Sequence, residues 1–392
     1  MTTQQKFFAN MRALGEFGAL TKLGREVLKN PTLTKNLASL PAHQNSDFVQ
    51  GLFDKLGVST LGTAQGAGQD YGLRTGLGQG FSAGMGKMSG RAVEPLPAGA
   101  QFIHGTFSNH AGSRHYKLYV PSCYEGQPLP LVVMLHGCTQ DPDDFAAGTQ
   151  MNAAAETHRC LVLYPQQSQG ANRSKCWNWF NDTDQRRDQG EPAILAGLTR
   201  EVMDRYHLDR RQVYVAGLSA GGAMAAILGT LYPDLYAGVG VHSGLPYGAA
   251  SDLPSALAAM RSGVTGKARP QQGRGGDAAF KGIPIIVFHG DADHTVNQRN
   301  GEQVLTGTAP TMASIGPPVR AQGKAANSHA YTRTVHTDAQ GKSVAEHWLI
   351  HGFGHAWAGG SPQGSYTDAR GPDATAEMMR FFYTHAIGPK DV

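Results

Sequence analysis

Apolar side chains follow two different repeats along this chain. From about residue 101 onward, short segments of consecutive or alternating apolar residues are separated by longer segments with an apolar side chain every three or four positions. The first pattern is typical of strands and the second of helices. We expect strands at Phe102–Phe107, Tyr116–Val120, Leu131–Leu135, Leu161–Tyr164, Gln212–Ala216, Ala237–His242, Ile283–Phe288 and Ala345–Ile350. We expect helices at Asp143–His158, Pro192–Tyr206, Ser219–Leu231 and Ala374–His385.

The alternation of these strands and helices predicts an α/β domain. Continuous apolar runs such as Leu131–Leu135 are expected where a parallel strand is buried on both faces. We therefore predict a mostly parallel eight-stranded sheet, antiparallel at its start and flanked by helices. Residues 246–281 and 306–327 are rich in Gly, Pro, Ala and Ser, so we predict two irregular insertions there.

The first hundred residues differ from the rest. Residues 1–50 carry apolar side chains at helical spacing, with a basic polar face within residues 6–29, which predicts an amphipathic helical extension. Such a face packs on its own domain or a partner, or adsorbs to a hydrophobic or anionic surface. Residues 51–100 are too poor in large apolar groups to form a core and predict a Gly-rich linker. The domain proper is expected over residues 101–388.

Composition narrows the class of partner and leaves the compartment open. The 34 basic and 30 acidic side chains are interspersed, so a net charge of +4 indicates no nucleic-acid surface. We see no secretory signal and no segment apolar enough to span a bilayer. Four clustered cysteines would allow two disulfides, which favour an oxidising compartment, whereas the missing signal favours the cytoplasm. Their spacing matches no zinc site. The four are Cys123, Cys138, Cys160 and Cys176.

One short motif sits where a strand meets a helix. Gly217-Leu-Ser219-Ala-Gly221 follows a predicted strand and opens a helix of small residues. In that context two glycines allow a sharp turn that exposes the serine hydroxyl above the sheet. A plain strand-to-helix turn is the alternative in so Gly-rich a chain. We predict that Ser219 is a nucleophile.

A serine nucleophile needs a histidine base and an acid that orients the base. His355 follows the last predicted strand, and Asp291 and Asp293 follow the strand before it. The order Ser219, Asp293, His355 is that of α/β-hydrolases. We select Asp293 as the acid and expect Asp291 to cap the turn, with an exchange of the two as the alternative.

The same fold stabilises an oxyanion with two backbone N–H groups. One belongs to the residue after the nucleophile, here Ala220, and the other to the loop after the Leu131–Leu135 strand. In that loop, His136-Gly-Cys-Thr-Gln140, we select Cys138 because the preceding glycine lets the backbone approach a substrate.

Together these motifs resemble the esterase family of polyhydroxybutyrate depolymerases, to which feruloyl and acetylxylan esterases are related. The resemblance spans about residues 102–386. It implies hydrolysis of polyester or short 3-hydroxyacyl esters through an acyl-enzyme, without metal or organic cofactor. It also implies that Trp177 and Trp357 line the substrate site, that Cys138 pairs with Cys176 and Cys123 with Cys160, and that the protein is extracellular. The motifs that carry it are Leu135–Gln140, Cys176–Phe180, Gly217–Met224, His289–Asp293 and Gly354–Gly360.

Two other functions fit parts of the sequence. A feruloyl or acetylxylan type of carbohydrate esterase would use the same triad on another substrate. A protein that binds a polymer or membrane surface through residues 6–29, with an incidental hydrolase fold, is the alternative from a different class.

Overall fold

The computed structural model describes residues 96–264, 282–309, 317–324 and 328–388. The expected amphipathic extension and nearly all of the Gly-rich linker lie outside these residues. In the described part of the chain, no helix is both long and apolar enough to cross a membrane.

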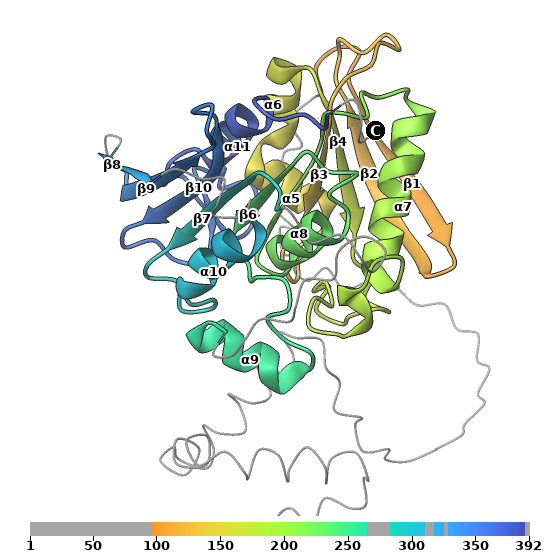
Figure 1. Cartoon of the computed structure of the whole chain (residues 1–392). Helices are drawn as coiled ribbons and strands as arrows, with labels where there is room; N and C mark the ends of the chain where they lie inside the picture. The colour runs from red at the N-terminus through yellow and green to blue at the C-terminus, as the bar shows by residue number, and fades with distance from the viewer. Residues whose placement is uncertain (1–95, 265–281, 310–316, 325–327, 389–392) are drawn as a thin grey trace, which may run out of the picture. The chain divides into compact units, whose positions relative to one another are not determined.

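A ten-stranded sheet forms the centre of the domain, in the order β1-β2-β4-β3-β5-β6-β7-β10-β9-β8 (Figure 1). Its middle six strands are parallel, and two antiparallel strands flank them at each side. The bounds are β1 Gln101–Asn109, β2 Gly112–Val120, β3 Leu131–Leu135, β4 Leu161–Gln166, β5 Val213–Leu218, β6 Gly238–His242, β7 Ile285–Gly290, β8 Val319–Lys324, β9 Ala330–Thr337 and β10 Ser343–Ile350. A separate two-stranded sheet joins β11 Trp357–Ala358 to β12 Thr367–Asp368.

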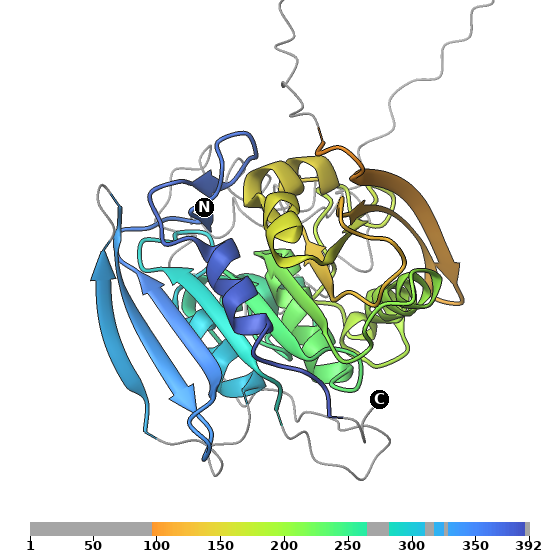
Figure 2. The ribbon, with the colours of Figure 1, turned by 90° about the horizontal axis from the view of Figure 1, so that it is seen from above.

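Helices cover both faces of the sheet (Figure 2). One layer contains α7 Gly190–Arg205, α8 Ala220–Leu231 and α10 Arg299–Thr308, with α9 Leu253–Ser262 packed on α10. The other contains α5 Pro142–Thr149, α6 Met151–His158 and α11 Ala374–Phe382. A short 3-10 helix, η1, spans Thr183–Gln185.

Strand alternation divides the core into two clusters, one under each helical layer. In β3, Leu131, Val133 and Leu135 join the cluster beneath α7 and α8, whereas Val132 and Met134 join the cluster beneath α11. All five are fully buried, which explains the uninterrupted apolar run in the sequence.

The structure confirms the fold class and corrects its details. The sheet has ten strands, not eight, because the β8–β9 hairpin extends it beyond β10. Residues of β8 are almost all exposed and pair through the backbone, so they lack the apolar pattern that reveals a strand. The predicted helix Asp143–His158 is two helices, divided at Gln150, whose φ of 55° is left-handed.

Parts of both predicted insertions are ordered. Residues 253–262 form α9, which begins with a capping box between Asp252 and Ser255. Residues up to 308 belong to α10, and β8 occupies 319–324. The remaining parts of the insertions lie outside the described residues.

Candidate active site

Ser219 stands at a sharp turn between β5 and α8. Its φ of 58° and ψ of −118° are strained for a residue with a side chain. The Ser219 N–H donates to the carbonyl of His242 at 2.9 Å, and the Ser219 carbonyl accepts from Ala223 N–H at 2.9 Å. A Cβ on Gly221 would lie 2.0 Å from the Leu135 carbonyl oxygen, so only glycine permits this close approach. The strand-turn-helix geometry of a nucleophile elbow is thus present, with Ser219 partly exposed.

Asp293 and His355 form a short acid–histidine pair. Asp293 Oδ2 lies 2.7 Å from His355 Nδ1, and its Oδ1 accepts from the N–H groups of Thr295 and Val296. Burial alone would raise the pKa of Asp293, but contacts with His289 and His355 and the backbone donors outweigh it and lower that pKa far below its usual range. The ionised carboxylate therefore holds a proton on His355 Nδ1 and leaves Nε2 free to accept one.

A second acid–histidine pair joins the same two loops. Asp291 Oδ2 lies 2.9 Å from His351 Nδ1, and Asp291 Oδ1 accepts from Gly352 N–H at 2.6 Å. Thr332 Oγ1 on β9 lies 2.9 Å from His351 Nε2. Asp291 therefore bridges to the histidine loop instead of capping its own turn.

These loops meet the elbow at one edge of the sheet. Ser219, Asp293 and His355 follow the carboxyl ends of β5, β7 and β10, which are parallel strands in the order β5-β6-β7-β10. The structure thus brings the three predicted triad residues to the edge where open α/β sheets bind their ligands.

The loop after β3 is held by its neighbours in a way that leaves one backbone donor unused. Gly137 N–H donates to Gln140 Oε1 at 2.9 Å and Thr139 N–H donates to Ser174 O at 2.6 Å. Within the described residues, the N–H groups of Cys138 and Ala220 have no hydrogen-bond acceptor. Both predicted oxyanion donors are therefore available to a ligand.

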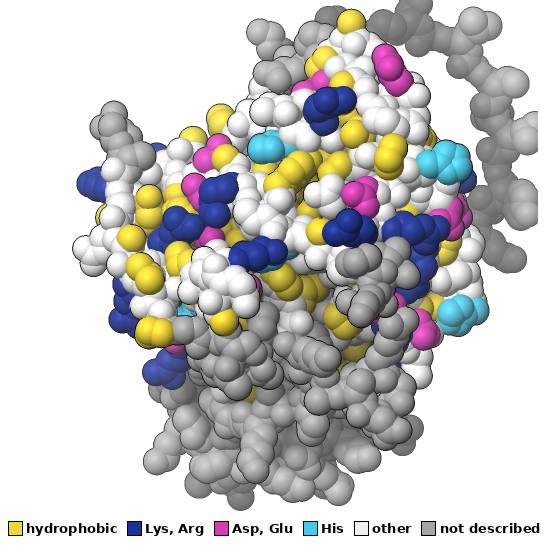
Figure 3. Space-filling view, turned by 45° about the horizontal axis from the view of Figure 1, so that its top comes forward, with side chains coloured by type: hydrophobic (Ala, Val, Ile, Leu, Met, Phe, Trp, Pro, Cys, Tyr) yellow, Lys and Arg dark blue, Asp and Glu magenta, His cyan; other side chains and the backbone are white. Residues whose placement is uncertain are grey.

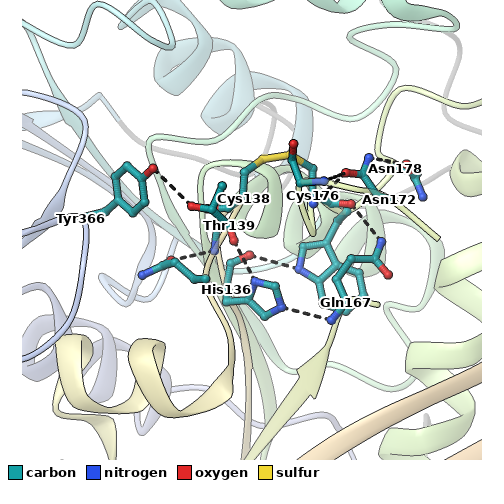
Figure 4. Close-up of a disulfide and its surroundings, with 12 residues drawn as sticks. His136, Cys138, Thr139, Gln167, Asn172, Cys176, Asn178 and Tyr366 are labelled. Atoms are coloured by element: carbon teal, nitrogen blue, oxygen red, sulfur yellow. Dashed lines mark hydrogen bonds between the residues drawn. A yellow bond between two sulfur atoms is a disulfide. The ribbon is translucent and has the colours of Figure 1, made fainter. Parts of the chain in front are cut away.

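The buried ring of His136 connects this loop to Gln167 (Figure 4). Burial lowers the pKa of His136 to about 4, so its ring is neutral at ordinary pH. Its Nε2 accepts from Gln167 N–H at 3.1 Å, which leaves Nδ1–H to donate to the Gly137 carbonyl at 2.7 Å.

One of the two disulfides implied by the resemblance is present. Cys138 and Cys176 are bonded, with their Cα atoms 4.2 Å apart (Figure 4). The pairing of Cys123 with Cys160 is wrong, because both are free thiols. Cys160 is buried, which raises the pKa of its thiol to about 12 and makes it unreactive.

Trp177 and Trp357 lie behind the site and not on its surface. Their exposed fractions are 0% and 1%, so neither side chain contacts a ligand in this conformation. The Trp177 indole N–H donates to the His136 carbonyl at 3.1 Å, and that of Trp357 donates to Thr375 Oγ1 at 3.0 Å. The resemblance gave these residues a substrate-lining role, whereas their surroundings give them a supporting one.

Sequence reasoning missed the residues that fasten the oxyanion loop. Gln140 Nε2 donates to Asp144 Oδ2 at 2.9 Å and to the Ser365 carbonyl at 3.0 Å, and Ser365 N–H donates to Asp144 Oδ1 at 3.0 Å. No local signal could reveal a contact between residues more than 220 positions apart.

Buried His242 was also missed. Its Nε2 accepts from Ala358 N–H at 3.0 Å, and its ring stacks on Trp357 with centroids 5.3 Å apart. Burial lowers the pKa of His242 well below its ordinary value, and the nearby histidines His289 and His355 lower it further. It therefore acts as a neutral hydrogen-bond acceptor beside the sheet edge that carries Ser219.

Charge on the molecular surface is mixed. On the face shown in Figure 3, basic side chains lie among acidic and apolar ones and form no continuous stripe. Within the described residues, no three His, Cys, Asp or Glu side chains are grouped to hold a metal ion.

Known proteins are similar to this chain in sequence and in fold. The chain is 33% identical over 255 residues to the poly(3-hydroxyalkanoate) depolymerase C of Paucimonas lemoignei, a match that covers 64% of this chain and 60% of that protein. It is 30% identical over 140 residues to feruloyl esterase B of Thermothelomyces thermophilus, covering 36% of this chain and 47% of the relative. The chain thus spans about half to three fifths of the length of these relatives.

The solved structure of an acetyl xylan esterase from Aspergillus awamori has the same fold. It superposes with a TM-score of 0.56 at 18% identity, covering 72% of this chain and 98% of that one. The family model described as esterase PHB depolymerase matches residues 114–313, more than half of the chain. These residues include the elbow, the acid loop and the oxyanion loop, and the chain belongs to the esterase family of PHB depolymerases.

Proposed function

We propose that this protein is a serine esterase that hydrolyses short-chain polyhydroxyalkanoates such as poly-3-hydroxybutyrate. The observation that carries this proposal is the 2.7 Å contact between Asp293 and His355 at the sheet edge where Ser219 occupies a strained elbow. Kinship with the Paucimonas depolymerase supports the choice of substrate.

The reaction follows from the roles of these three residues. His355 Nε2 takes the proton from Ser219 as the hydroxyl oxygen attacks the ester carbonyl, and the imidazolium then protonates the leaving alcohol. Asp293 stabilises that imidazolium and keeps its orientation. Water, activated by the same histidine, next attacks the acyl-enzyme and releases the acid.

Charge that develops on the carbonyl oxygen is met by the N–H groups of Cys138 and Ala220. Each such donor contributes about 3–4 kcal/mol to transition-state stabilisation when it is preorganised. The disulfide and the Gln140 contacts hold Cys138, and the start of α8 holds Ala220.

Hydrolysis of feruloyl or acetylxylan esters is the second candidate. The same triad would act on them, and kinship with a feruloyl esterase favours it. Only the contacts made by the rest of the substrate separate the two functions.

The test is release of 3-hydroxybutyrate from an amorphous polymer suspension, beside methyl ferulate and p-nitrophenyl acetate, for wild type and Ser219→Ala. We expect the wild type to clear the polymer and Ser219→Ala to lose at least about 10³-fold in turnover while unfolding at the same temperature. Cleavage of methyl ferulate alone would transfer the assignment to the second candidate. Retained activity in Ser219→Ala would refute the nucleophile.

We also propose that residues 6–29 adsorb to a hydrophobic polymer surface and that the protein works in an oxidising, extracellular compartment. The basic amphipathic pattern supports the first idea and the disulfide supports the second. A chain lacking residues 1–95 should sediment less with polymer particles yet cleave p-nitrophenyl acetate. Equal sedimentation of both chains would refute the adsorption.

A further inference from the structure

Tyr366 is one of three exposed large apolar side chains in the described part of the chain, with 47% of its surface exposed. Its φ of 53° is left-handed, a conformation that bulky side chains rarely adopt. An aromatic ring in strained backbone and open to solvent contributes little to the core. Such outliers cluster where function requires them.

The backbone and the hydroxyl of Tyr366 connect it to both halves of the active site. Its carbonyl accepts from Trp357 N–H at 2.7 Å, two residues after His355. Its hydroxyl lies 3.3 Å from Thr139 Oγ1, and Thr139 directly follows the oxyanion donor Cys138 (Figure 4). The ring therefore lies between the loop of the base and the loop of the oxyanion donors.

The segment that carries Tyr366 is hydrogen-bonded to the buried side chain of Gln140. Gln140 contacts both Gly137 N–H, at 2.9 Å, and the Ser365 carbonyl, at 3.0 Å. One buried side chain thus positions the oxyanion loop and the residue next to Tyr366. The backbone that carries the ring therefore has a defined position.

Thr139 faces Tyr366 in an equally unusual conformation. It is exposed, and its φ of 68° is unfavourable for a β-branched residue. Its hydroxyl donates to the Cys138 carbonyl at 2.6 Å, so Tyr366 must be the donor in the 3.3 Å contact. At that length the hydrogen bond is weak, and a carbonyl oxygen of a ligand would replace Thr139 at little cost.

We propose that Tyr366 is the aromatic substrate contact of this site. Its ring packs against the apolar repeat unit next to the ester being cleaved, and its hydroxyl donates to the carbonyl of that neighbouring unit. Tyr366 takes the role that the resemblance assigned to Trp177 and Trp357. The identity of the polyester rests on the proposed function, whereas the position of the ring does not.

The test compares kcat/KM for a soluble 3-hydroxybutyrate trimer with kcat/KM for p-nitrophenyl acetate. The acetyl group of the second substrate has no neighbouring repeat unit that could pack against the ring. Tyr366→Ala should lower the trimer-to-acetate ratio about tenfold, mainly through KM for the trimer. Tyr366→Phe keeps the ring and should lower the ratio two- to threefold. Val319→Ala, the matched truncation of another exposed apolar residue, should leave the ratio unchanged.

A further variant separates the ring from the backbone. Tyr366→Gly removes the ring and places at this position a residue that tolerates a positive φ. It should therefore lower the trimer-to-acetate ratio about tenfold, as Tyr366→Ala does. A wild-type ratio in either variant would overturn the proposal.

Binding distinguishes failure of this proposal from failure of the proposed function. Affinity for the trimer, measured by calorimetry in the Ser219→Ala background, should fall about tenfold on adding Tyr366→Ala. If the wild type cleaves no trimer but that difference in affinity persists, the esterase assignment fails and the contact stands. Equal affinities, or no binding by either protein, would overturn the contact whatever the turnover.

Discussion

Asp291 and Asp293 are two residues apart and have different partners. The side chain of Asp293 is fully buried and contacts His355, whereas the side chain of Asp291 is 30% exposed and contacts His351. Only the first of these histidines has a place in the proposed reaction. The structure thus supplies a physical reason to choose between the two acids.

Asp293→Asn should lower kcat on p-nitrophenyl acetate by about 10³–10⁴-fold, because the amide stabilises neither the imidazolium nor the required tautomer. Asp291→Asn should lower it by less than about tenfold, since the lost contact only positions the loop. Steady-state kinetics of both variants at pH 8 check this. A large loss in Asp291→Asn with near-normal Asp293→Asn would exchange their roles.

The sequence was sufficient to propose three triad residues, which the structure brings to one edge of the sheet, but not to predict the residues around them. Ser219, Asp293 and His355 were selected because each follows a strand with a recognisable apolar run. Tyr366 follows no such strand, and its place depends on contacts that its neighbour Ser365 makes with residues more than 220 positions away. The tryptophans were misplaced because amphipathic rings serve equally in cores and binding sites.

At the scale of elements, the central parallel strands could be predicted, whereas the edge formed by β8 and β9 could not. Strands such as β3 and β7 are buried on both faces, so composition alone reveals them. β9 pairs with β10 and β8 pairs with β9, and the side chains of both strands are mostly exposed or half-buried. α9 did have a sequence signal, the cap at Asp252 followed by Pro254.

The disulfide connects two elements of the site, the oxyanion loop and the loop of residues 172–181. It joins positions 38 residues apart, for which the chain-entropy model gives up to about 4 kcal/mol of stabilisation. Cys176→Ser should lower the free energy of unfolding by as much as that and reduce ester turnover severalfold, because Cys138 loses its brace. Urea unfolding and kinetics measure the two effects.

Two comparisons control for this. Adding reductant to the wild type should reproduce the behaviour of Cys176→Ser, and Cys123→Ser should change stability by less than about 1 kcal/mol. If reductant leaves the wild type unaffected, the bridge contributes nothing to the loop.

At the scale of the whole molecule, several buried histidines link stability to pH. Burial lowers the pKa of His136, His347 and His385 to about 4, against about 6.5 in an unfolded chain. Between these values the unfolded chain binds more protons, so the free energy of unfolding rises with pH. Buried Asp184 and Glu191, whose pKa values are raised, oppose this in part.

We expect the melting temperature to fall as pH decreases from about 6.5 to about 4, with each histidine contributing at most about 1.4 kcal/mol per pH unit. His385→Phe should flatten this slope by roughly one proton, because His385 Nε2 is buried without a hydrogen-bond partner in the described structure. Scanning calorimetry across this range measures the slope. An identical slope in the variant would mean that His385 does not titrate on unfolding.

The paired bridges Asp291–His351 and Asp293–His355 make the acid loop and the histidine loop a single unit. The surface around Tyr366 and Thr139 is held in addition by Gln140 and Asp144, whose contacts involve neither of these two pairs. An engineer could therefore replace the side chains of Tyr366 and Thr139 while both acid–histidine pairs keep their contacts. In evolutionary terms, one reaction could serve polyesters in some descendants and plant-wall esters in others by changes confined to one side of the sheet edge.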